Sequence, residues 1–185
     1  MLDLTGKLLI AMPGMGDPRF EHSVVFLCSH TDKGAMGLII NKPTPEADFA
    51  DLLEQLSIEA VESPRATPIY FGGPVELGRG FVLHSADYHL EEMTLTVDAQ
   101  FAMTATRDIL VDIANGEGPQ KALLALGYAG WGAGQLESEL QQNGWLSCDA
   151  TPEVVFEVPD AEKWTAALKL LGVDALMLSA TAGRA

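Results

Sequence analysis

Short apolar runs separated by turn residues dominate the first half of the chain. SVVFLCSH (23–30) and AMGLIIN (35–41) have the length and side chains of strands, and the turn TDKG between them indicates a hairpin. Further strands are expected over Gly6 to Met12, Ile69 to Gly72, Phe81 to Ser85, Met93 to Val97, Ala122 to Ala129, Trp145 to Asp149 and Glu153 to Val158.

Four segments instead carry signals of helices. The first is expected to begin at Thr44 and Pro45, since a threonine cap followed by proline is a typical helix start. Its apolar residues recur at i, i+3, i+4 and i+7, which predicts one buried face. That face consists of Phe49, Leu52, Leu53 and Leu56. The other helices are expected from Thr104 or Thr106 to Gly116, from about Ala133 to Gln142, and from Asp160 to Leu171.

The order of these elements bears on the fold class. Strands come in groups and helices are inserted singly, which favours an α+β fold with a largely antiparallel or mixed sheet over a doubly wound parallel one. A length of 185 residues favours a single domain spanning residues 1–185.

The charge balance limits the partners that the protein could have. The chain has 11 basic and 26 acidic residues and a net charge of −15, without a cluster of Lys or Arg. Such a field repels phosphate backbones, so we expect no direct nucleic acid binding. The acidity serves solubility or suits a basic protein partner.

The cysteines and the lengths of the apolar runs bear on the cellular compartment. Two isolated cysteines fit a reducing compartment, and no apolar run approaches a membrane span. We expect a cytoplasmic bacterial protein that does not act at a membrane.

The glycine-rich segment LGYAGWGAGQLESEL (126–140) raises the question of a nucleotide site. A dinucleotide fingerprint would need glycine at Gln135 or Glu137, and the Lys and Ser or Thr of a P-loop are missing. Glu137 would also place negative charge at the start of the following helix. The glycines therefore serve close packing or positive φ angles around Tyr128 and Trp131, or expose backbone N–H groups to a ligand.

Cys28 and His30 lie two residues apart on an expected strand, so both side chains should face the same way. A thiol beside an imidazole suggests a reactive Cys28 or half of a metal site. No second pair with metal-ligand spacing exists, so no metal and no cofactor are expected. A reactive thiol and an inert buried cysteine both remain open for Cys28.

Polar and aromatic residues on the expected loops are candidates for the wall of a cleft. They show no combination of nucleophile, base and oxyanion donors, so they indicate no reaction class. The candidates are Asp17, Asn41, Arg79, His84, Trp131 and Gln135.

Several segments together resemble the YqgE/AlgH family of bacterial proteins. They are LIAMPGMGDPRFEHSVVFLCSHTDKGAMGLIINKP, FGGPVELGRGFVLHS, TRDILVDIANGEGP and LGYAGWGAGQLESEL followed by WL, in the family's order and at its intervals. The resemblance implies a bifurcated sheet folded into a pseudo-barrel with about four helices around it. It implies no established enzyme class and no assigned catalytic residue. The family's label of transcriptional regulator comes from an effect on alginate production.

Three hypotheses about function follow, of which a direct DNA-binding regulator is the one that the net charge of −15 opposes. The first is a non-enzymatic regulatory or binding protein that acts on a protein or small-molecule partner through the cleft. The alternative is an enzyme of unknown class that uses a thiol or a histidine, with Cys28 or His84 as the reactive group.

Overall fold

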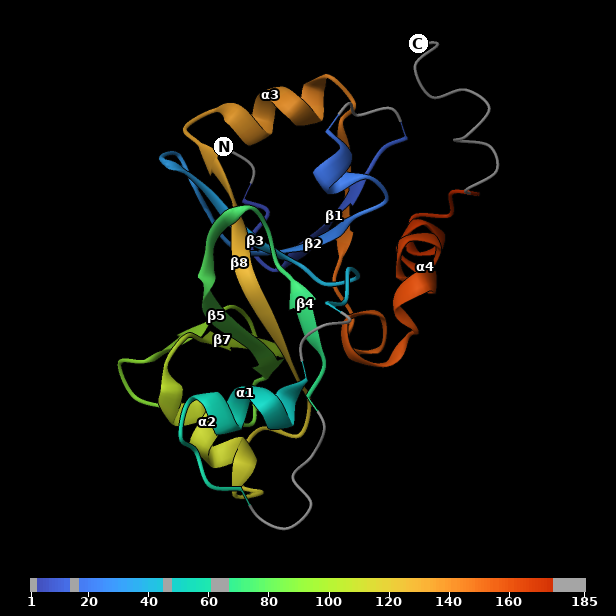
Figure 1. Cartoon of the computed structure of the whole chain (residues 1–185). Coiled ribbons are helices and arrows are strands. Elements are labelled where there is room, and N and C mark those ends of the chain that lie inside the picture. Colours follow the sequence, from blue (N-terminus) through green and yellow to red (C-terminus); the bar gives the residue numbers. More distant parts are fainter. Residues whose placement is uncertain (1–2, 14–16, 45–47, 61–66, 175–185) are drawn as a thin grey trace.

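A computed structural model describes residues 3–13, 17–44, 48–60 and 67–174 (Figure 1). Within these residues nine strands form one sheet in the order β6-β7-β5-β8-β3-β2-β1-β9, and β4 pairs with β8 beside this path. The strands are β1 Lys7–Ala11, β2 Val24–Thr31, β3 Gly34–Ile39, β4 Ile69–Phe71, β5 Val75–Ser85, β6 Thr94–Thr96, β7 Phe101–Thr104, β8 Ala122–Gly132 and β9 Trp145–Asp149.

Strand β8 is the branch point of the sheet. Its first half pairs antiparallel with β5 and parallel with β4, whereas its second half pairs antiparallel with β3. The other strand pairs among the described residues are antiparallel. The expected α+β fold with a mixed, mostly antiparallel sheet is therefore confirmed.

The chain crosses β8 between β4 and β5, and the crossing requires glycine. A Cβ at Gly73 would lie 2.1 Å from the carbonyl carbon of Tyr128, and one at Gly72 would lie 2.3 Å from the carbonyl oxygen of Gly127. Gly127 itself has a φ of 76°. Glycine alone fits such a close backbone approach and such a φ at little cost. This confirms a packing role for one glycine of the 126–140 segment.

Four α-helices and three short helical turns cover the described part of the sheet (Figure 1). Helices α1 and α2 pack against β5 and β8 through one apolar cluster that includes Leu53, Ile109, Val82 and Leu124. Helix α4 contacts β1, β2 and β9, and α3 contacts β8, β3 and β9. Their bounds are α1 Phe49–Gln55, α2 Arg107–Ala114, α3 Gln135–Gln141 and α4 Lys163–Leu170, with 3₁₀ turns η1 Pro18–Phe20 and η3 Asp160–Glu162 and a π-helical turn η2 Glu153–Glu157.

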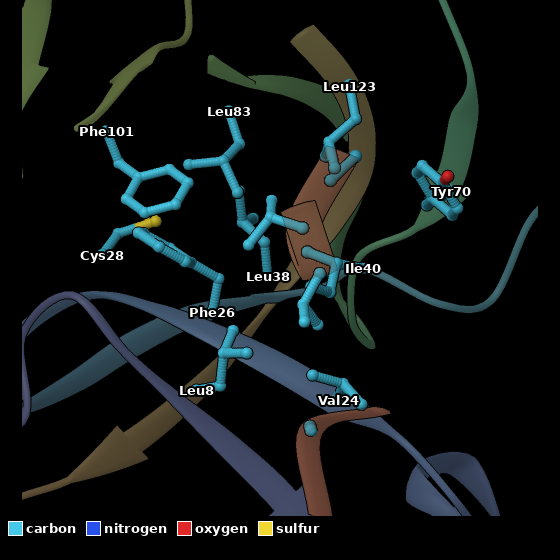
Figure 2. Close-up of a cluster of buried hydrophobic side chains, with 14 of the residues drawn as sticks. Leu8, Val24, Phe26, Cys28, Leu38, Ile40, Tyr70, Leu83, Phe101 and Leu123 are labelled. Atoms are coloured by element: carbon cyan, nitrogen blue, oxygen red, sulfur yellow. The ribbon is translucent and has the colours of Figure 1, made fainter. Parts of the chain in front are cut away.

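Both faces of the central strands are buried. Along β1, Leu8 and Ile10 belong to one apolar cluster and Leu9 to another on the opposite face, and all three are fully buried. Figure 2 shows the first cluster, in which Phe26 and Phe101 pack with ring centroids 4.9 Å apart. Strands buried on both faces explain why the sequence reads as continuous apolar runs.

Two expected elements take another form. The segment Glu153–Val158 is not a strand but the turn η2, in which the Val155 N–H donates to the carbonyl of Thr151 at 3.0 Å and Thr151 Oγ1 accepts from the Val154 N–H. A short apolar run does not distinguish a strand from a buried helical turn. Strand β7, which the hydrophobic pattern did not indicate, follows β6 and pairs with both β5 and β6.

Several expected boundaries also move. Helix α1 does not begin at Thr44, whose N–H and hydroxyl bind the carbonyl of Ile69, and Pro45 lies outside the described residues. Asp48 is the N-cap instead, accepting from the Ala50 N–H at 2.8 Å. On the predicted buried face, Leu56 is 38% exposed, and Leu171 of the last predicted helix is 40% exposed. No helix within the described ranges is long and apolar enough to cross a membrane.

Candidate functional site

The groove that we call the arch groove lies between the first part of β5 and the β2–β3 hairpin. It is open to solvent and has a volume of about 640 Å³. The first part of β5, residues 75–79, forms the arch seen in Figure 1, in which Val75 pairs with β8 and residues 76–79 have no pairing partner in β8. The groove is lined by Ser29, Thr31, Lys33, Gly34, Ala35, Met36, Val75, Glu76, Arg79, Phe81, Tyr128, Gly130 and Trp131.

The floor of the groove is made of small or flexible residues that are neighbours in the sheet. Ser29 pairs with Met36, and Met36 pairs with Gly130, so the three positions lie side by side across β2, β3 and β8. Gly130 has no positive φ, and a Cβ there would meet the Tyr128 ring at 3.3 Å. Its missing side chain therefore keeps the floor hollow.

The arch exists because β5 and β8 pair out of step. Val75 pairs with Tyr128 and the next pairing joins Gly80 to Leu126, so β5 uses more residues than β8 over this stretch. Glu76 takes up part of this excess with a φ of 50°, in the left-handed region that non-glycine residues rarely occupy. Val75 and Leu77 are 36% and 55% exposed, so the arch stands clear of the core.

The polar groups of the groove have few protein partners. The Arg79 guanidinium lies 5.0 Å from the centre of the Phe81 ring and 3.9 Å from the Glu76 carboxylate, at the limit of an ion pair. The Lys33 ammonium and the Ser29 and Tyr128 hydroxyls bind no other side chain or backbone group of the described chain. Convergent polar groups with spare hydrogen-bonding capacity are the usual mark of a small-molecule site.

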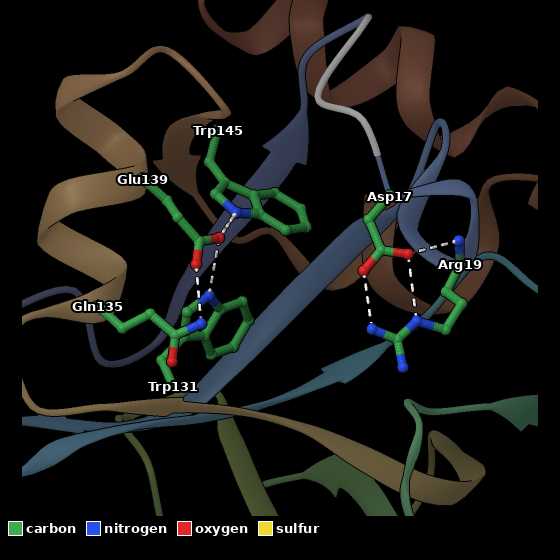
Figure 3. Close-up of polar contacts among 6 residues, drawn as sticks. All are labelled: Asp17, Arg19, Trp131, Gln135, Glu139 and Trp145. Atoms are coloured by element: carbon green, nitrogen blue, oxygen red, sulfur yellow. Dashed lines mark hydrogen bonds and ion pairs between the residues drawn. The ribbon is translucent and has the colours of Figure 1, made fainter.

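Trp131 is the second predicted residue that lines the groove, but its indole is already bound. Glu139 accepts from Trp131 Nε1 at 3.2 Å, from Trp145 Nε1 at 2.9 Å and from Gln135 Nε2 at 3.0 Å (Figure 3). Gln135 also accepts from the Gly132 N–H at 3.0 Å. Gln135 and Glu139 therefore fix the turn from β8 into α3, and Gln135 does not line the groove.

The other predicted cleft residues lie elsewhere. Asp17 caps η1 and forms a two-point ion pair with Arg19, with oxygen–nitrogen distances of 2.8 and 3.1 Å (Figure 3). The Asn41 side chain accepts from the Val24 N–H at 2.9 Å and donates to the carbonyl of His22 at 2.8 Å. Asp17 therefore orders its own turn and Asn41 joins two strand ends, and neither lines the arch groove.

His84 is fully buried and part of the core. Its Nδ1 lies 2.8 Å from the carbonyl of Ser85, and its Nε2 lies 2.8 Å from Thr104 Oγ1. Burial lowers the pKa of His84 below its ordinary value. The six predicted residues thus do not form one cleft, because polar side chains in turns and at strand ends also bind backbone groups that have no partner in the sheet.

Cys28 and His30 do not face the same way. The pairing of β2 with β3 shifts between Leu27 and Ser29, and this bulge adds one residue and changes the alternation. Cys28 packs in the first apolar cluster, and burial raises its pKa to about 12. His30 instead lies near the second cluster, where Nδ1 accepts from the Leu4 N–H at 3.0 Å and Nε2 lies 2.7 Å from Glu137.

The thiol and metal hypotheses gain no geometric support from these positions. Cys148 is buried as well, and burial raises its pKa to about 11. Across the described ranges, no group of three or more His, Cys, Asp or Glu side chains is placed to hold a metal ion.

Sequence reasoning missed Ser29, Lys33 and Tyr128 as groove residues. Lys33 lies within the TDKG turn and Ser29 two residues before it, and this pattern by itself indicates only a hairpin connection. Tyr128 lies in the glycine segment, whose pattern bears on nucleotide motifs and on packing but not on a groove. A hairpin tip that carries a lysine in an acidic chain was the available signal.

Comparison with known proteins agrees with this fold. The model of the AlgH-like family matches residues 8–176. UPF0301 proteins of Ruegeria pomeroyi and Paracoccus denitrificans are 61% and 58% identical to this chain, and the alignments cover 100% and 99% of it and 100% and 97% of those proteins.

Solved structures show the same architecture. The solution structure of the AlgH protein from Pseudomonas aeruginosa is 46% identical, with a TM-score of 0.79 over 99% of this chain and 96% of that one. A crystal structure of a Corynebacterium diphtheriae protein, 19% identical, has a TM-score of 0.72 over 91% of this chain and 87% of that one, which shows the fold alone. The protein belongs to the AlgH-like family.

Proposed function

We propose that the protein is a non-enzymatic binding protein with a regulatory role, and that the arch groove is its binding site. The observation that carries this proposal is the combination in one groove of Lys33, Arg79 and two hydroxyls: within the described residues the Lys33 ammonium and the hydroxyls have no hydrogen-bond partner, and Arg79 has a carboxylate only at 3.9 Å. A groove of this size lies within the roughly 300–1,000 Å³ of small-molecule sites. It contains no cysteine or histidine that could act as a nucleophile or a general base.

We base the regulatory role on the label of the family. We base the location in the cytoplasm on the composition. We infer that the protein acts in the cytoplasm as one domain and exerts its effect through a bound small molecule or protein partner. The net charge of −15 makes direct contact with DNA unfavourable. An effect on gene expression would therefore pass through the ligand or the partner.

The groove can be tested by filling its floor. Gly130→Leu would place a side chain between Ser29, Met36 and Tyr128 without backbone strain, because Gly130 has no positive φ. The matched control is Gly132→Leu, on the same strand but outside the groove lining, where a Cβ meets only Gln135 at 3.9 Å.

A thermal-shift screen of a metabolite collection would compare the two variants with the unmodified protein. We expect at least one compound that raises the melting temperature of the unmodified protein and of Gly132→Leu, and that has no effect on Gly130→Leu. Stabilising compounds that act equally on all three proteins would place the binding site elsewhere and overturn the proposal.

Thiol labelling separates this proposal from a thiol enzyme. With pKa values of about 12 and about 11, Cys28 and Cys148 hold well under 1% thiolate at pH 8. We expect an aromatic disulfide reagent to label neither cysteine in the folded protein within minutes, and to label both at once in denaturant. Rapid labelling of folded Cys28 would favour the thiol enzyme.

A further inference from the structure

The distribution of oxygen partners among the lysines and arginines singles out the arch groove. Most lysines and arginines in the described ranges have an oxygen partner within 3.3 Å. The partnered cations are Lys7 with Asp149, Arg19 with Asp17, Lys42 with the carbonyl of Glu21, Arg107 with the carbonyls of Leu56 and Ser57, Lys121 with Glu157, and Lys163 with Asp160 and the carbonyl of Ile40. The exceptions are Lys33, Lys169 and Arg79, and two of these line the same groove.

This distribution is informative because the chain has a large excess of acids. With 26 acidic residues for 11 basic ones, a cation at the surface has many carboxylates available. Lys42 and Arg107 bind backbone carbonyls instead. Lys33 and Arg79 share one groove and have no oxygen partner within 3.3 Å among the described residues, so their charge is available to something outside the protein. Among the described residues, Glu76 supplies the one carboxylate within 4 Å of the Arg79 guanidinium, at 3.9 Å, and both side chains are more than half exposed.

The Arg79 side chain is also held in place. Its guanidinium lies over the ring of Phe81, a residue of the core that is 4% exposed. A guanidinium over an aromatic face is attracted by the ring and keeps its N–H donors free for a planar acceptor. The donors of Arg79 are therefore arranged for a carboxylate or a phosphate before any ligand binds.

We propose that the arch groove binds a small organic anion that carries hydroxyl groups. Arg79 binds the carboxylate or phosphate in two-point geometry, and Lys33 supplies a second positive charge. The carboxylate of Glu76 and the hydroxyls of Ser29 and Tyr128 bind hydroxyl groups of the same molecule. This inference rests on the proposed function of the groove and adds the chemical class of its ligand.

The net charge of the protein does not oppose this assignment. Exposed charges farther away than about 8 Å are largely screened at physiological ionic strength, whereas the two cations stand at the binding site itself. The same two cations oppose a basic peptide in this groove. The composition favoured a basic partner, so the groove and the overall charge point to different ligands.

The test is a chemical-shift titration of backbone amides with defined probes. The probes are inorganic phosphate, glycerol 3-phosphate, glycerate and, as the neutral probe, glycerol. We expect the two organic anions to shift the amides of Ser29, Gly34 and Gly130 in a saturable way, and glycerol to leave them unchanged. The tighter of glycerol 3-phosphate and glycerate identifies the head group.

Three variants make the titration decisive. Arg79→Met and Lys33→Met should each weaken the binding of the anions at least tenfold. Lys169→Met removes the unpaired cation that lies outside the groove and should leave the binding unchanged. Equal losses in all three variants, or a response to glycerol as strong as to the anions, would overturn the inference.

The outcome separates the inference from the proposed function. If no anion shifts the groove amides while Gly130→Leu still abolishes the binding of a neutral or cationic compound, the groove is the site and the anion assignment is wrong. If neither anions nor any compound of the metabolite screen depend on Gly130, both the assignment and the proposed function fail.

Discussion

Two parts of the molecule each combine an acidic, a basic and an aromatic side chain, but with different roles. In the arch groove, Arg79 lies three residues after Glu76 and 5.0 Å from the ring of Phe81. In the second part, which we call the sealed cluster and which consists of Tyr70, Asp160 and Lys163, the lysine lies three residues after the aspartate and 4.9 Å from the tyrosine ring.

The two parts differ in whether their polar groups are buried and bound to one another. The sealed cluster has an ion pair of 3.0 Å, a Tyr70 hydroxyl that donates to Asp160 at 2.7 Å, and a Lys163 ammonium that donates to the carbonyl of Ile40 at 2.8 Å. Lys163 is 1% exposed, so it ties η3 and α4 to the sheet. The groove has the same kinds of side chain, but they lie farther apart and are exposed to water. A polar cluster with no capacity left stabilises the fold, and one with spare capacity is available to a ligand.

The largest effect is expected from opening the sealed cluster. Lys163→Met leaves Asp160, the Tyr70 hydroxyl and the Ile40 carbonyl without their cation, and removing one partner of a buried ion pair costs about 3 kcal/mol. Urea unfolding would measure the loss. Lys169→Met, on the exposed side of the same helix, is the control and should stay within about 0.5 kcal/mol. Equal stability of the two variants would remove the distinction between the two parts.

The polar cluster around Glu139 should lose stability in proportion to the number of acceptors removed. Glu139→Ala leaves the buried indole N–H groups of Trp131 and Trp145 without an acceptor, which costs about 2 kcal/mol in unfolding free energy. Glu139→Gln keeps one side-chain oxygen and should lose about half as much. Tryptophan fluorescence during urea unfolding reports both the stability and the surroundings of the indoles. A loss in Glu139→Gln as large as in Glu139→Ala would show that the charge, and not the acceptor, matters.

The buried imidazole makes stability depend on pH. The pKa of His84 is lowered from 6.5 by burial, so below pH 6.5 the unfolded chain takes up a proton that the folded chain does not. This contribution to stability is complete above pH 6.5 and is lost as the pH falls toward the folded pKa, by at most about 1.4 kcal/mol per pH unit. Unfolding free energies at pH 7.5 and 5.5 would measure it, and His84→Gln should reduce the difference. An unchanged difference in the variant would assign the pH dependence to other groups.

The smallest effect is expected in the groove itself. Arg79→Met and Lys33→Met remove exposed cations with loose or no protein partners, and we expect changes in unfolding free energy within about 0.5 kcal/mol. The same variants should lose anion binding, so stability and binding separate. A loss near that of Lys163→Met would instead make Arg79 a structural residue like its buried counterpart.

The sequence predicted the frame of the fold better than its details. The positions of β1, β2, β3 and β8 follow from apolar runs, because strands buried largely on both faces leave little room for polar residues. The arch of β5 was not predicted, because Pro74, Gly78 and Gly80 look like separators in the sequence, whereas the structure places all but the proline inside an irregular strand.

The residues of the candidate groove were predicted only in part, for a related reason. Arg79 and Trp131 line the groove, but Lys33 joins them through the pairing of β3 with β8, nearly a hundred residues away in sequence. Local patterns contain no information about such pairings. The bulge in β2 is a similar case, because one extra residue separated Cys28 from His30 against the rule of alternation.

The branching of the sheet at β8 has a consequence for synthesis on the ribosome. Strands β3, β4 and β5 all pair with β8, and β1 finds its second partner only in β9. The first 120 residues therefore emerge with their sheet edges open, and contacts distant in sequence form slowly. A nascent chain halted before residue 132 would expose these edges together, so this protein should depend on chaperones most strongly just before β8 leaves the exit tunnel.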